Sequence, residues 1–154
     1  MKKSKQKNLL DIILMSAAVL FGALTLIIMV APGIIYNLGL GTYEPSVYNL
    51  LNYGDTLRAG LLIALIFAIV FVVCVLGLVL VKLLGKSFKA EGLVALCAAA
   101  LEIVAGVLFF FTKSLIEENG NSLVSLGVGA ILAGIFAILG ACALGVCVIK
   151  KLVK

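Results

Sequence analysis

The chain has 154 residues, of which 64% are hydrophobic and 12% are charged, and its formal net charge is +5. A soluble domain of this length has about a quarter of its residues charged and under half apolar. The composition therefore excludes an ordinary soluble domain and indicates a single-domain integral membrane protein.

Four apolar runs are long enough to cross a membrane, because about 20 apolar helical residues span roughly 30 Å of hydrocarbon. They predict an all-α membrane protein, one domain over residues 1–154, in which four transmembrane helices form a bundle. The first run follows four lysines, as a signal peptide does. It is about twice as long as the apolar part of such a peptide, and we interpret it as a retained anchor. The predicted spans are Leu9–Ala31, Ala59–Leu84, Gly92–Phe111 and Leu123–Ile149.

Lysine and arginine near the span ends predict the orientation. Ten of them lie on one side, in the two tails and in the connection between the second and third spans, and only Arg58 and Lys113 lie on the other. Because positive residues favour the cytoplasmic side, we expect both termini in the cytoplasm and residues 32–58 and 112–122 outside the plasma membrane. The ratio of eleven lysines to one arginine favours a bacterial source. These scattered lysines suit anionic lipid head groups and, without interleaved aromatic residues, predict no nucleic-acid surface.

The first outward connection contains every tyrosine of the chain, namely Tyr36, Tyr43, Tyr48 and Tyr53. Tyrosine favours the boundary between membrane and water. Apolar residues at helical spacing after Pro45 predict a short helix, Ser46–Asn52, on the outer membrane surface. The connection is long for a plain linker, so two interpretations stay open: a connector anchored by tyrosines, or an interface that binds a partner or covers a pore.

The fourth span carries small residues at every fourth position. Such a stripe lets helix backbones approach closely in lipid, where there is little hydrophobic drive for helices to associate. It is compatible with packing inside the chain and with contact to a second copy or a partner subunit. The stripe consists of Gly129, Ala133, Ala137, Ala141 and Gly145.

Glu102 is the one acid near the middle of a predicted span. A carboxylate at the centre of a bilayer costs several kcal/mol, and no lysine, arginine or histidine lies at its depth in the other spans. Three interpretations follow. A neutral Glu102 donates a hydrogen bond to a helix backbone, it contacts another protein, or it faces a wet cavity and carries a proton or cation.

Catalytic chemistry is not predicted. The chain contains no histidine, no G-x-S-x-G element and no Gly-rich phosphate loop ending in lysine. All four cysteines lie inside the spans, where we interpret them as small apolar residues. We therefore expect no enzyme activity, no metal site and no cofactor.

The layout, with both tails inside and a longer first outward connection, resembles that of the claudin and peripheral-myelin type tetraspan families. The resemblance is one of topology, because those families carry a tryptophan motif and a cysteine pair in that loop and this chain has neither. A membrane glutamate in a four-span chain is also similar to small multidrug transporters, whose glutamate lies in the first span whereas Glu102 lies in the third. We transfer no residue roles from these families.

The sequence favours a small non-enzymatic tetraspan protein that acts as an interaction or accessory subunit through its transmembrane helices and its Tyr-rich outer connection. Its expected partners are the lipid bilayer and a membrane protein or a second copy of the chain. The alternative is a small transporter or channel that uses Glu102 for proton or cation coupling.

Overall fold

The computed structural model describes residues 2–37, 39, 41–52, 58–86, 89–116 and 124–152, with the backbone alone at 2–8 and 150–152. Its long helices are α1 (Lys2–Ile28), α3 (Ala59–Leu83), α4 (Glu91–Phe110) and α6 (Val128–Leu152). The described residues also form two short helices, α2 (Val47–Leu50) and α5 (Thr112–Ile116). Three strands complete this part of the chain: β1 (Ile34–Asn37), β2 (Thr42–Tyr43) and β3 (Val124–Leu126).

As predicted, each of the four long helices is long and apolar enough to cross a membrane. Four such helices are the pattern of a multi-pass membrane protein. The first ends at Ile28 rather than Ala31, because the residue before Pro32 is disfavoured in helical geometry. The fourth begins at Val128 because Val124–Leu126 pair as a strand. Its predicted start, Leu123, lies outside the described residues.

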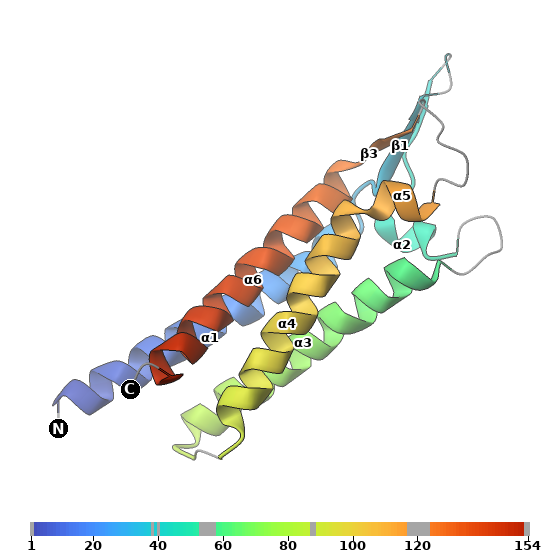
Figure 1. The fold of residues 1–154 in the computed structure, drawn as a ribbon. Coiled ribbons are helices and arrows are strands. Elements are labelled where there is room, and N and C mark those ends of the chain that lie inside the picture. The colour runs from blue at the N-terminus through green and yellow to red at the C-terminus, as the bar shows by residue number, and fades with distance from the viewer. Residues whose placement is uncertain are drawn as a thin grey trace.

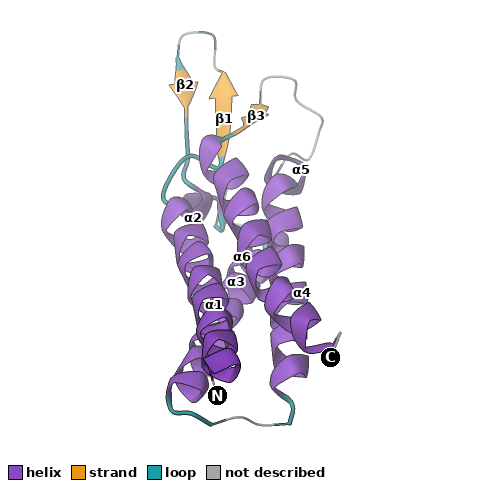
Figure 2. Ribbon diagram, turned by 90° about the vertical axis from the view of Figure 1, so that its left-hand side faces the viewer, coloured by secondary structure: helices purple, strands orange, loops and turns teal. Residues whose placement is uncertain are grey.

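Each long helix packs against two others, since α1 and α4 each contact both α3 and α6. Figures 1 and 2 show the four helices running side by side, with successive spans in opposite directions. Both termini and the α3–α4 connection therefore lie at one end, here called the terminal end. The strands, α2 and α5 lie at the other end, here called the sheet end.

Glycines mark two places where neighbouring helices approach closely. A Cβ atom added at Gly22 of α1 would lie 2.9 Å from the ring of Phe71 in α3. One added at Gly106 of α4 would lie 3.2 Å from the Cβ of Ala137 in α6. Small residues thus set the helix spacing, as expected where packing rather than hydrophobic drive holds helices together.

The sheet end contains an antiparallel sheet in the order β2-β1-β3. Tyr36 pairs with Tyr43 across β1 and β2, and Ile35 pairs with Ser125 across β1 and β3. The connection between α1 and α3 supplies β1 and β2, and the connection between α4 and α6 supplies β3. The sheet therefore joins segments about 90 residues apart. The chain is therefore mostly helical rather than all-α. Periodicity along one segment does not reveal such a pairing, because the partner strand is remote in sequence.

The sheet is attached to the bundle through backbone hydrogen bonds at the start of α6. The Gly127 N–H donates to the Gly33 carbonyl over 2.9 Å, and the Gly129 N–H donates to the Pro32 carbonyl over 2.7 Å. A Cβ atom at either Gly127 or Gly129 would collide with the backbone around Pro32. Only glycine permits this approach, which fixes the sheet relative to the helices.

The helix α2 lies inside the predicted range Ser46–Asn52. The Ser46 hydroxyl accepts a hydrogen bond from the Asn49 N–H over 3.2 Å and caps the helix start. Val47 and Leu50 are fully buried. This short helix therefore packs onto the ends of the spans with one apolar face.

Candidate functional site

Glu102 lies in the interior of the four-helix bundle. Its side chain is 0% exposed. Ala98, Ala105 and Gly106 on the same side of α4 are also buried, whereas Ile103 and Val104 are exposed. The acid thus faces the neighbouring helices of its own chain, and the lipid-facing side of α4 is apolar.

Two apolar clusters fill the bundle, and Glu102 lies where they meet. Along α4, Ala99 belongs to the cluster nearer the terminal end, and Ala105 belongs to the cluster nearer the sheet end. Ala68 and Ala137 are fully buried but belong to neither cluster. We call the positions between the clusters the intermediate layer, which consists of Thr25, Ala68, Glu102 and Ala137, one from each long helix.

Neither carboxyl oxygen of Glu102 has a hydrogen-bond partner within the described part of the chain. The other polar side chain of the intermediate layer, Thr25, is already engaged, because its hydroxyl donates to the Phe21 carbonyl over 3.0 Å. The backbone hydrogen bond expected for a neutral Glu102 is therefore not formed among these residues.

The described cations lie away from the intermediate layer. Lys82 is in the last turn of α3 at the terminal end, and Arg58 directly precedes α3 at the sheet end. An ionised carboxylate without a partner inside a bilayer costs several kcal/mol. The arrangement therefore suits a carboxyl group that carries a proton or receives a cation from elsewhere.

The small-residue stripe of α6 is used mainly inside the chain. Ala133, Ala137 and Ala141 are buried, and Gly129 packs against the backbone of Ala31 and Pro32. Gly145 differs, because it is only partly buried and an added Cβ atom would meet nothing within 4 Å. Four members of the stripe therefore build the bundle and the fifth borders open space.

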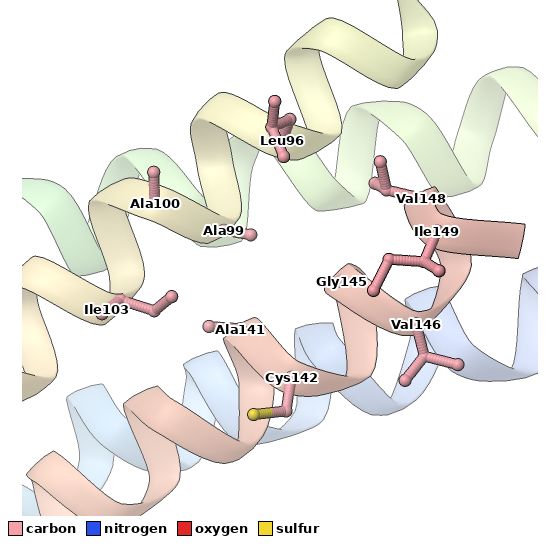
Figure 3. Close-up of a pocket in the computed structure, with 10 residues that line it drawn as sticks. All are labelled: Leu96, Ala99, Ala100, Ile103, Ala141, Cys142, Gly145, Val146, Val148 and Ile149. Atoms are coloured by element: carbon pink, nitrogen blue, oxygen red, sulfur yellow. The ribbon is translucent and has the colours of Figure 1, made fainter. Parts of the chain in front are cut away.

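That open space is a groove between α4 and α6 with a volume of about 450 Å³. Figure 3 shows side chains from both helices bordering it, and Figure 1 shows the two helices diverging toward the terminal end. Glu102 is not among the lining residues, although its neighbours Ala99 and Ile103 are. The lining consists of Leu96, Ala99, Ala100, Ile103, Ala141, Cys142, Gly145, Val146, Val148 and Ile149.

The tyrosines of the first connection have two different environments. The rings of Tyr36 and Tyr43 stack with their centroids 6.0 Å apart, and Tyr43 is 50% exposed. The Tyr48 hydroxyl donates to the Leu26 carbonyl over 2.8 Å and ties α2 to the end of α1. Tyr53 lies outside the described residues. The structure thus brings Tyr36 and Tyr43 together on the sheet. It places Tyr48 apart from them, where its hydrogen bond holds α2 against α1.

Buried and half-buried charges at the terminal end were not expected from the sequence. The Lys82 Nζ lies 3.2 Å from the Glu91 Oε1 and joins the end of α3 to the start of α4. Asp11 of α1 is also buried. The sequence contains a pattern that predicts this ion pair. Lys82 and Glu91 have opposite charges and flank a short connection between antiparallel helices, which brings their positions together.

In the described ranges, no group of three histidine, cysteine or acidic side chains could hold a metal ion. Cys74, Cys97 and Cys142 are free thiols.

Comparison with known proteins assigns no family. A scan against protein-family models, a search of curated proteins and a search of solved structures each found no match to this chain.

Proposed function

We propose that this protein is a non-enzymatic interaction or accessory subunit of a bacterial plasma membrane, with both termini in the cytoplasm. The distribution of lysine and arginine supports the orientation. The proposed binding surface is the sheet end, which carries the stacked Tyr36–Tyr43 pair; Tyr36 is half-buried and Tyr43 is exposed. The partner is another membrane protein or a second copy of the chain.

The observation that carries this proposal is the construction of the sheet end. The connection between α1 and α3 and the connection between α4 and α6 contribute strands to one sheet, and backbone hydrogen bonds from Gly127 and Gly129 hold it on the bundle. A plain connector needs neither a paired register nor these close contacts. Surface segments held by a rigid scaffold commonly carry binding functions, and tyrosine is enriched in protein interfaces.

Photo-crosslinking in native membranes tests this proposal. A photoreactive phenylalanine analogue at Tyr43 is expected to form one discrete protein adduct. The same analogue at Lys89, an exposed residue at the terminal end, serves as the control. The proposal fails if position 43 gives no protein adduct, or if positions 43 and 89 give the same set.

A second candidate function is proton or cation transport through Glu102. The specific observation in its favour is the fully buried carboxyl group, whose two oxygens lack partners among the described residues. Ionisable groups inside membranes commonly belong to ion or proton pathways. Transport would require water or a cation to reach the intermediate layer as the helices move.

Flux measurements in reconstituted vesicles distinguish this candidate. Under a pH gradient or a sodium gradient, the parent protein is expected to give flux that Glu102→Gln abolishes. Glu91→Gln is the matched control, because Glu91 is a buried acid on the same helix but lies at its end. Absence of flux in the parent, or equal flux in Glu102→Gln, would exclude transport through this residue.

A further inference from the structure

We propose that the groove between α4 and α6 binds an acyl chain of one anionic membrane lipid, which remains with the protein as a resident ligand. The inference is independent of the partner-binding function proposed above. It rests on the lining, the length and the surroundings of the groove.

The lining suits a hydrocarbon chain. All ten residues around the 450 Å³ space are apolar or small, and the thiol of Cys142 is their only polar side-chain group. Figure 3 shows Ala99 and Ala141 on the facing sides of the two helices, with Ile103 extending toward the space between them. Leu96, Val146 and Ile149 complete the larger apolar side chains of the lining. Apart from this weakly hydrogen-bonding thiol, such walls offer no hydrogen-bonding side chain to a polar ligand, whereas methylene groups gain dispersion contacts along their length.

The length of the groove favours an acyl chain over a partner helix. From Ala141 to Ile149, α6 advances by about 12 Å at roughly 1.5 Å per residue. A transmembrane helix lies against its partner over much of the roughly 30 Å hydrocarbon layer. An acyl chain needs only a short, narrow channel, and the missing side chain of Gly145 provides its width.

The groove follows from how the two helices are joined. Gly106 lets α4 approach Ala137 and Ile138 of α6 closely, and beyond this contact the helices diverge toward the terminal end (Figure 1). Gly145 lies on the diverging part, where a Cβ atom would meet nothing within 4 Å. An empty gap in a packed bundle forfeits contacts on both walls, so an acyl chain there would stabilise the divergent geometry.

Charge at the same end selects the head group. Lys86 and Lys89 are exposed at the terminal end, and Lys150 and Lys151 directly follow the lining residue Ile149 in sequence. A cluster of lysines beside a membrane attracts anionic head groups by about 1 kcal/mol per residue. A lipid whose chain lies in the groove would therefore be retained best when its phosphate head group carries net negative charge.

Native mass spectrometry of the full-length protein in mild detergent tests the proposal. The parent is expected to retain one anionic phospholipid, and Gly145→Phe, which fills the groove, should reduce the retained fraction at least tenfold. Gly77→Phe is the matched control, since Gly77 of α3 is exposed, also has nothing within 4 Å and lies outside the groove. Ala100→Phe provides a second filling variant from the opposite wall.

Rebinding gives an independent readout. After delipidation, the parent is exposed to phosphatidylglycerol or to phosphatidylcholine with the same chains, and modification of Cys142 by a lipophilic maleimide is followed. Phosphatidylglycerol should slow modification of Cys142, which lines the groove, and leave Cys97 unchanged, because that exposed thiol lies outside it. The proposal is overturned if no lipid is retained, if Gly145→Phe and Gly77→Phe retain equal amounts, if both lipids protect Cys142 equally, or if the groove is occupied by a protein crosslinked through Cys142.

Discussion

Replacement of Glu102 by methionine should stabilise the folded bundle. Glu102 is fully buried and neither of its oxygens has a described partner. Methionine has a similar length and volume, has no strong hydrogen-bonding group, and adapts to irregular space. The substitution therefore removes an unsatisfied polar group from the intermediate layer without leaving a large cavity.

The magnitude follows from the cost of leaving a buried polar group unpaired, which is about 1–3 kcal/mol. The unfolded chain in a micelle also finds partners for its polar groups, which lowers the measured benefit in membrane proteins. We therefore expect Glu102→Met to raise the free energy of unfolding by about 1 kcal/mol or more. Glu102→Gln keeps a polar group in place and should stay close to the parent.

The assay is reversible unfolding of the full chain in mixed micelles of a mild detergent and dodecyl sulfate, followed by far-ultraviolet circular dichroism. Glu102→Ala serves as the size control, because large-to-small core substitutions cost about 2–5 kcal/mol through the cavity they leave. If Glu102→Met is destabilised as much as Glu102→Ala, the carboxyl group contributes a favourable interaction. The description of Glu102 as an unpaired buried acid would then be wrong.

Three further substitutions and one fusion test other parts of the structure. Ala137→Leu should destabilise the bundle by about 1–3 kcal/mol through overpacking against Gly106. The control Gly77→Leu, on an open helix surface, should not destabilise it. Equal unfolding midpoints for the two variants would place Ala137 outside the core. Tyr48→Phe should cost about 0.5–1.5 kcal/mol in the same assay through loss of its hydrogen bond, and an unchanged midpoint would mean that the bond contributes nothing. Gly127→Ala should open the contact between the sheet and α6 and speed proteolysis at the sheet end, whereas unchanged cleavage would contradict the close backbone approach. A green fluorescent protein fused to the C-terminus should fluoresce in bacterial cells, because the proposed orientation places this terminus in the cytoplasm. A dark but stably produced fusion would contradict that orientation.

Local patterns predicted the helical part of the fold well. An apolar run of about 20 residues has few ways to satisfy its backbone in lipid other than a helix, so the four long helices follow from composition and length. The boundary at Val128 was missed because strand β3 replaces the expected helix start, and its partner strand β1 lies about 90 residues earlier. Pairings over such distances leave little trace in local periodicity.

For the candidate site, too, some features follow from the sequence and others only from the tertiary structure. The sequence by itself determined that Glu102 is an isolated acid in a long apolar helix and that α6 carries a stripe of small residues, because both features depend only on spacing along one helix. Only the tertiary structure decided that Glu102 faces the bundle interior without a described hydrogen bond, that most of the stripe packs inside the chain, and that Gly145 borders a groove. The physical reason is that the direction of a helix face and the divergence of two helices depend on contacts among all four spans.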